Sequence, residues 1–128
     1  MSKVKLRILS KANGESTIFS AHGEWTRENA ENVLVYPQDD SIVCISEKNG
    51  YMTMERQGDC YLFLPFQKGS ASTGYIGIDK NTKGEIPVQT ESVAVEFTDS
   101  LLTIELKYVL PQHDGNQNRN LRIIAEKV

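Results

Sequence analysis

The chain has 128 residues, which is enough for one domain with one hydrophobic core, and we expect a single domain over residues 1–128. Its formal net charge is −3 at pH 7 and its pI is near 5.4, so it lacks the excess of Lys and Arg that nucleic-acid and anionic-membrane binders carry. No apolar run approaches the roughly 20 residues of a membrane span, and residues 1–11 lack the apolar segment of a secretory signal. We therefore expect a cytoplasmic protein with no nucleic-acid and no membrane partner.

Cysteine, histidine and serine positions give no sign of a catalytic or metal site. Cys44 and Cys60 stand in no CxxC motif and have no neighbouring histidine, so reduced thiols are favoured over a disulfide. His22 and His113 have no metal-ligand residues at suitable spacing and are expected in solvent. The chain also lacks a G-x-S-x-G elbow, a P-loop and a G-x-G-x-x-G motif. We therefore predict no cofactor, no metal and no enzymatic activity.

Tight turns divide the first part of the chain into strands. Residues 4–9 alternate between apolar and charged side chains and lead into Asn13-Gly14, the strongest short-range hairpin signal. With these two residues as the turn, the hairpin has one apolar inner face. Its apolar cross-strand pairs are Ile8 with Phe19 and Leu6 with Ala21. Residues 24–32 are polar with little apolar periodicity, which predicts a short helix or a loop before a strand at residues 32–36.

The middle of the chain contains two further tight turns and predicts a three-stranded meander. The first turn, at residues 49–50, places Arg56 opposite Val43. If the second turn, at residues 58–59, is also two residues long, Tyr61 joins Arg56 on the same face. A bulge or an odd-length loop would instead reverse the last strand, and both faces of the meander are partly apolar, so the sequence does not fix which face is inside.

The clearest hairpin spans residues 91–110. A two-residue turn at residues 99–100 pairs apolar side chains along one face of both arms and polar side chains along the other. The apolar pairs are Phe97 with Leu102, Val95 with Ile104 and Val93 with Leu106. This stripe ends at Glu91, close to Pro87, where we expect a rim or a strand kink. Upstream, the glycines of residues 69–79 predict a bulge, a bend or the close approach of another chain or ligand.

A final strand at residues 121–126 completes roughly eight to ten short strands with almost no helix, which predicts an all-β domain. The run of consecutive hairpins favours an antiparallel up-and-down barrel, because closure removes the exposed edges of an open sheet. A barrel of this size can enclose one small ligand.

Several short segments resemble the YwiB-like family of small bacterial proteins. They are residues 51–58 (YMTMERQG), Gly74-Tyr75, and residues 84–110 with Pro87, Thr90 and the closing LKYVL, and the most specific piece is Arg56-Gln57-Gly58. The resemblance implies a calycin-like barrel, the architecture of lipocalins and fatty-acid-binding proteins, in a family whose function is unknown. It carries over no catalytic residue.

Arg56 is the principal candidate for ligand binding, because its predicted neighbours are apolar and a buried guanidinium is unfavourable unless it is paired. In one interpretation it anchors an anion inside the barrel. The tyrosines available to complete such a carboxylate clamp are Tyr61, Tyr75 and Tyr108. The apolar residues proposed to contact the ligand are Met54, Val95 and Ile104. In the other interpretation Arg56 lies at a strand end and pairs with Glu47 or Glu55 at the rim.

Two hypotheses for function follow. The first is a protein that binds a small hydrophobic or anionic ligand in the barrel interior. The second is a structural or interaction module with a filled core, which acts through its outer surface and includes the case of a homodimer. The two differ in whether the interior is hollow, and side-chain volumes alone do not decide this. Basic residues near both chain ends would form an outer strip if the first and last strands pair: Lys3, Lys5, Arg7, Arg119, Arg122 and Lys127.

Overall fold

A computed structural model describes residues 2–111 and 115–128 of the chain. The described residues form ten β-strands, and none of them forms a helix long and apolar enough to cross a membrane. The strands are β1 (Ser2–Ala12), β2 (Glu15–Glu28), β3 (Glu31–Gln38), β4 (Ser41–Lys48), β5 (Tyr51–Gln57), β6 (Tyr61–Gln67), β7 (Ala71–Asp79), β8 (Thr82–Phe97), β9 (Leu101–Leu110) and β10 (Gln117–Lys127).

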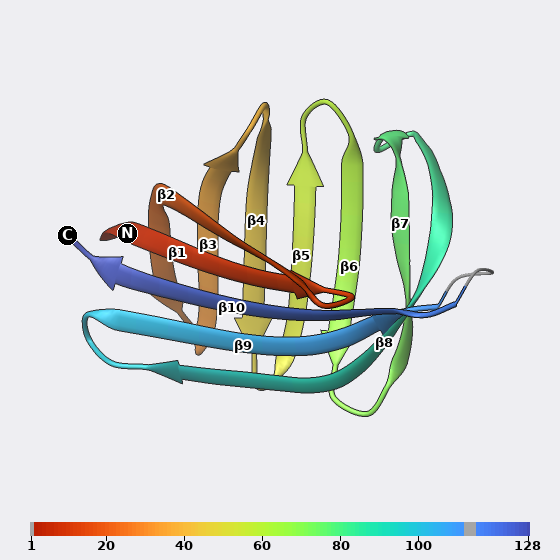
Figure 1. The fold of residues 1–128 in the computed structure, drawn as a ribbon. Helices are drawn as coiled ribbons and strands as arrows, with labels where there is room; N and C mark the ends of the chain where they lie inside the picture. Colours follow the sequence, from red (N-terminus) through yellow and green to blue (C-terminus); the bar gives the residue numbers. More distant parts are fainter. Residues whose placement is uncertain (1, 112–114) are drawn as a thin grey trace.

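Each strand pairs antiparallel with its neighbours in sequence, and β1 pairs with β10 to close the barrel. The predicted all-β, up-and-down barrel is therefore confirmed. In Figure 1, β1, β8, β9 and β10 form a layer in front of β3 to β7, and the two layers cross. The long strands β2 and β8 each contribute to both layers, so the sheet closes without a free edge.

Two Asn-Gly turns set the registers of their hairpins as predicted. Asn13 and Asn49 have φ values of 51° and 53°, and the glycines that follow are also in the left-handed region, as a type I′ turn requires. These turns pair Ile8 with Phe19 in the β1–β2 hairpin and Val43 with Arg56 in the β4–β5 hairpin. Arg56 therefore lies on the inner face of β5.

The β8–β9 hairpin has the predicted register, with Phe97 opposite Leu102 and Val93 opposite Leu106. The pairing shifts between Thr90 and Ser92, so Glu91 occupies a bulge at the position of the expected kink. The extra residue shifts the alternation of β8, so Thr90 and Val88, which precede the bulge, are both buried.

The structure decides the alternative left open for β6 and corrects one prediction. Residues 58–60 form a loop of three residues, the odd-length case, so Arg56 pairs with Leu62 and β6 turns its other face inward. Residues 24–32 form neither a helix nor a loop, because β2 continues to Glu28 and a turn at Asn29-Ala30 leads directly into β3. This part of β2 lacks the apolar–polar alternation typical of a strand, because most of its residues are polar and several face solvent at the end of the barrel.

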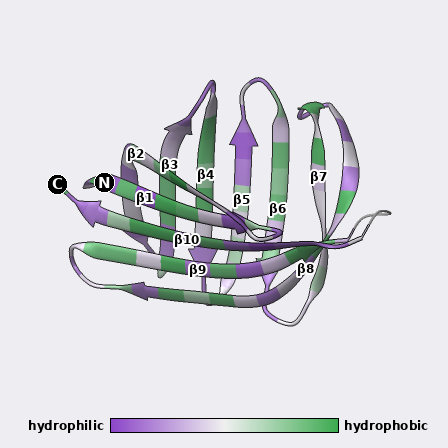
Figure 2. Ribbon diagram, viewed as in Figure 1, coloured by the Kyte–Doolittle hydropathy of each residue, from purple (hydrophilic) through white to green (hydrophobic). Residues whose placement is uncertain are grey.

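Apolar side chains fill one end and the middle of the barrel. Hydrophobic residues alternate with hydrophilic ones along the strands in Figure 2. The largest fully buried side chains are Phe66, Leu6, Leu34, Ile45, Met52, Leu64, Leu102, Ile104, Leu106 and Ile123. Beyond this core, Trp25 Nε1 donates a hydrogen bond to Asn32 Oδ1 at 3.1 Å, and Asn32 Nδ2 donates to Glu47 Oε2 at 3.0 Å. This buried chain of polar groups closes the filled end.

Candidate functional site

The opposite end of the barrel encloses a cavity of about 390 Å³. This volume falls in the range of roughly 300–1,000 Å³ that small-molecule sites occupy. All ten strands contribute lining residues, which are mainly apolar. The lining residues used below are Tyr36, Met54, Arg56, Leu62, Ile86, Tyr108, Gln117 and Arg119. The interior is therefore neither wholly filled nor wholly hollow.

Arg56 and Tyr36 enter the cavity from the same wall. Val43 pairs with both residues, so their side chains share the inner face on either side of it. The Nε atom of Arg56 is buried and has no hydrogen-bond partner among the described residues. Its ion pair is a long one, 3.8 Å from Nη2 to Oδ2 of Asp39, and the Asp39 side chain is 75% exposed. An exposed pair of this kind contributes little to stability.

Tyr108 and Arg119 enter the cavity from β9 and β10. They are direct cross-strand partners, and the Tyr108 ring packs against Phe66 with 4.8 Å between ring centroids. Arg119 Nη2 donates a hydrogen bond of 2.8 Å to Gln117 Oε1. The Nε atom of Arg119, like that of Arg56, is buried without a hydrogen-bond partner in the described part of the chain.

Both cavity tyrosines have a raised pKa and are neutral phenols at neutral pH. Burial raises the pKa of Tyr36 to about 12, although the nearby Arg56 charge acts in the opposite direction. Burial also raises the pKa of Tyr108, against the lowering effect of the charge and hydrogen bond of Arg119. At neutral pH both phenols are therefore hydrogen-bond donors that face the cavity.

The cavity contains three of the seven residues proposed from the sequence. Arg56, Met54 and Tyr108 line it. Ile104 is buried in the filled core and Val95 packs against that core, so neither lines the cavity.

Tyr61 and Tyr75 do not line the cavity, so the structure does not place them beside Arg56 as the sequence predicts. The three-residue loop before β6 turns Tyr61 to the outer face, where its hydroxyl donates a hydrogen bond of 2.9 Å to Glu55 Oε2. Tyr75 pairs with Glu85, and Lys83 Nζ lies 5.1 Å from its ring and 5.5 Å from the ring of Tyr61. The two tyrosines thus share a lysine outside the barrel.

The rim interpretation of Arg56 named the wrong acidic partners. Glu47 is buried at the filled end, where it accepts hydrogen bonds from Asn32 and from the Gly50 amide. Glu55 accepts hydrogen bonds from Tyr61 and Gln57 on the outer face. Arg56 combines a cavity position with a weak ion pair at the mouth, to Asp39.

Sequence reasoning missed Arg119 and Tyr36. The outer basic strip expected from the sequence includes Arg119, but its alternation with Leu121, Ile123 and Ala125 places it on the inner face of β10. That alternation was the available signal. Tyr36 likewise alternates with Leu34 on the inner face of β3.

The rest of the basic strip is partly as expected. β1 and β10 do pair, and the outer face carries exposed Lys3, Lys5, Arg7 and Arg122. Lys127 instead lies at the filled end, with its Nζ 5.2 Å from the Trp25 ring.

The cavity lining contains no Asp, Glu, His or Cys among the described residues. His22 is exposed opposite Lys5, and the His113 prediction lies outside the described residues. The described residues contain no group of three potential metal ligands. Cys44 and Cys60 are free thiols, as predicted.

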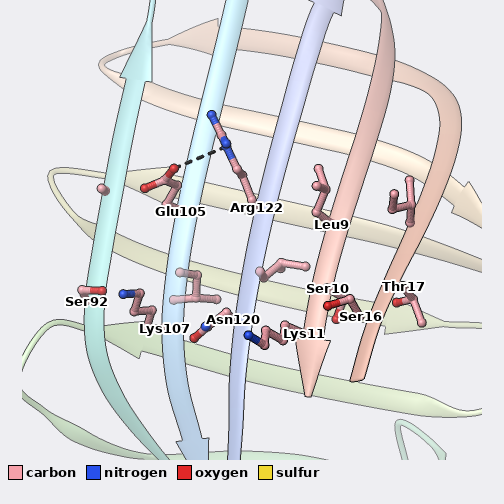
Figure 3. A pocket seen from close by; sticks show the side chains of 14 residues that line it. Leu9, Ser10, Lys11, Ser16, Thr17, Ser92, Glu105, Lys107, Asn120 and Arg122 are labelled. Carbon is pink, nitrogen blue, oxygen red and sulfur yellow. Dashed lines mark ion pairs between the residues drawn. The ribbon is translucent and has the colours of Figure 1, made fainter. Parts of the chain in front are cut away.

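A second hollow, of about 510 Å³, lies on the outer surface of β1, β2, β8, β9 and β10. Figure 3 shows Lys11, Lys107 and Arg122 in it, with Arg122 directed toward Glu105, and Arg122 Nε is 3.3 Å from Glu105 Oε1. Its charged groups are solvated, so they need no ligand. The guanidinium Nε atoms of the interior cavity are buried, which makes the interior the stronger candidate.

Fold and site define a class of protein: a small, closed, calycin-like barrel with a cavity at one end that is lined by apolar residues, two arginines and two tyrosines. The chain matches the family described as "Domain of unknown function (DUF1934)" over residues 3–123, and it belongs to that family. The crystal structure of the ywiB protein from Bacillus subtilis is similar, with a TM-score of 0.86 at 18% identity, over 99% of this chain and 92% of that one. This likeness confirms the calycin-like fold and the predicted family resemblance. No curated protein matches the chain.

Proposed function

We propose that the chain binds a small amphipathic anion in its interior cavity. The observation that carries this proposal is Arg56, a guanidinium on the lining of a mainly apolar cavity, with a buried Nε that has no partner among the described residues. A buried donor without a partner costs about 1–3 kcal/mol, and more when it is charged. An anion bound beside Arg56 would remove that cost.

The rest of the lining supports the same class of ligand. Tyr36 and Tyr108 add neutral hydroxyl donors to the cavity. Leu62 and Ile86 supply apolar wall, which favours a hydrocarbon portion by roughly 25 cal/mol for each Å² removed from water. The ligand would therefore have an oxyanion at one end and an apolar remainder.

We infer binding rather than catalysis as the activity. The described lining lacks the His, Cys, Asp and Glu side chains that most often act as bases or nucleophiles. Donors that are fixed in place and remain protonated suit the retention of an anion. We also propose a cytoplasmic location, which is supported by the exposed free thiol of Cys60.

The first experiment is native mass spectrometry of freshly purified protein, compared with its denatured mass. A mass excess that disappears on denaturation supports a bound small molecule. Ligand-free protein is then titrated calorimetrically with octanoate and with 1-octanol, which have the same chain length and differ in head-group charge. We expect octanoate to bind more tightly.

Variants at matched positions test the role of Arg56. Arg56→Met should weaken octanoate binding about tenfold or more, because a charge-assisted hydrogen bond contributes roughly 1.5–3 kcal/mol. Arg122→Met removes an arginine from the outer face and should leave binding unchanged. If neither octanoate nor any co-purified molecule binds, or if both variants bind equally well, the proposal is wrong.

A second candidate function uses the outer hollow. Ile18 and Leu9 both line it and are 75% and 37% exposed, so the hollow has an apolar part that favours a protein contact, including self-association. Size-exclusion chromatography with light scattering tests this. A dimer that becomes monomeric in Ile18→Lys supports an outer interface, whereas a monomer at all concentrations removes the homodimer.

A further inference from the structure

The cavity contains two arginine–tyrosine pairs rather than one. Tyr36 and Arg56 belong to β3 and β5, and Tyr108 and Arg119 belong to β9 and β10. β5 and β10 are opposite one another in the closed ring of ten strands. The two guanidinium groups therefore reach the same cavity from opposite walls.

The charge of this lining is unbalanced. Arg56 and Arg119 contribute two positive charges, and no described lining residue is Asp or Glu. Asp39 lies outside the lining, 3.8 Å from Arg56, and its mostly exposed side chain is screened by solvent. A ligand with one negative charge would match one guanidinium and leave the other uncompensated.

The hydrogen-bond donors are duplicated in the same way. Each guanidinium has a buried Nε without a partner in the described residues, and each has a phenol nearby on its own wall. An arginine fork matches the spacing of two oxygens in a carboxylate or a phosphate. Two forks and two hydroxyls suit an anionic group with three or more oxygen acceptors.

We propose that the natural ligand carries two negative charges on oxygen at its polar end, as in a phosphate monoester or a dicarboxylate, and an apolar remainder. This inference rests on the proposed function and specifies its ligand class. Arg119 is the residue that distinguishes it from a single-arginine carboxylate clamp.

Octyl phosphate and octyl sulfate provide the test, because both have a tetrahedral oxyanion on the same chain but differ in charge. Phosphate monoesters have a second pKa near 6, so octyl phosphate is largely a dianion at pH 7.5 and a monoanion at pH 5. We expect octyl phosphate to bind at least tenfold more tightly than octyl sulfate at pH 7.5 by calorimetry. This advantage should shrink at pH 5, because octyl phosphate then has one negative charge, as octyl sulfate has at both pH values. The affinity for octyl sulfate should therefore be nearly the same at pH 5 and pH 7.5. 2-Octylmalonate, a dicarboxylate, shows which dianion is preferred.

Arg119→Met should reduce the affinity for octyl phosphate at least tenfold and abolish its advantage over octyl sulfate. Arg122→Met, three positions along the same strand but on the outer face, should change neither quantity. Thermal unfolding shows that the variants fold, and Arg119→Met should be no less stable than the parent chain, because it removes a partly buried charge whose Nε has no partner among the described residues.

If octyl phosphate and octyl sulfate bind with equal affinity, and Arg56→Met weakens both, the ligand does not need two negative charges. The inference is then wrong and the proposed function stands. The same holds if Arg119→Met preserves the phosphate preference. If no octyl anion binds at all, both the inference and the proposed function are wrong.

Discussion

Tyr108 and Arg119 are directly opposite one another on β9 and β10, and both side chains enter the interior cavity. The pair combines a neutral hydroxyl donor with a guanidinium, and the ring of Tyr108 is held in place by its contact with Phe66. Because both side chains come from paired strands of a closed sheet, their relative position does not depend on a mobile loop. The site is therefore organised before a ligand arrives.

Removal of the Tyr108 hydroxyl tests its role as a donor. Tyr108→Phe should weaken octyl phosphate binding about two- to tenfold, since a net hydrogen bond contributes roughly 0.5–1.5 kcal/mol. The ring contact with Phe66 persists, so stability should change little. Calorimetric titration measures the effect, with Tyr51→Phe at an exposed position as the control. Equal affinities in the two variants would exclude Tyr108 from the site.

Alkaline pH should destabilise the fold through Tyr36. The phenol ionises at pKa 10.0 in an ordinary environment and at about 12 in the folded protein. Between these values the unfolded chain has released a proton that the folded chain retains, so stability falls as pH rises and is fully present below pH 10. Two pKa units correspond to about 2–3 kcal/mol.

Urea unfolding between pH 8 and pH 12 measures this dependence. Tyr36→Phe removes the titrating group and should give a shallower decline than the parent chain. A decline of the same slope in both proteins would show that Tyr36 is not the group responsible.

The polar chain at the filled end should contribute to stability but not to binding. Asn32→Ala leaves the Trp25 indole N–H and one Glu47 carboxylate oxygen without their partner. We expect a loss of about 1–3 kcal/mol in the free energy of unfolding. Asn120→Ala, at an exposed position, is the control. A folded Asn32→Ala protein with reduced octyl phosphate affinity would contradict the separation of the two ends.

Close approach of strands makes Gly74 intolerant of a side chain. A Cβ at Gly74 would lie 2.6 Å from the carbonyl oxygen of Phe63 and 3.0 Å from Leu64 Cδ2. Gly74→Ala should therefore cost roughly 1–3 kcal/mol. Gly84 has no atom within 4 Å of the same position, so Gly84→Ala should be neutral or more stable by up to about 1 kcal/mol. Chemical denaturation compares the two, and equal effects would contradict this account of β7.

Local sequence accounts for much of the fold. Asn13-Gly14 and Asn49-Gly50 adopt the left-handed backbone that tight hairpin turns need, and alternation on both arms then fixes which side chains share a face. The sequence therefore predicts Arg56 on the same face as Val43, but both faces of that hairpin are partly apolar, and only the structure shows that this face lines the cavity. The regular spacing of the turns predicted a closed up-and-down barrel in the same way.

Tertiary structure decided the composition of the site. A one-residue difference in loop length at residues 58–60 reverses every side chain of β6, and Tyr61 therefore lies outside while Leu62 lines the cavity. Arg56 and Arg119 reach the same cavity because β1 pairs with β10, which joins the two ends of the chain and closes the barrel. Alternation within a strand determines which residues share a face, but only closure of the barrel determines which faces confront one another across the cavity.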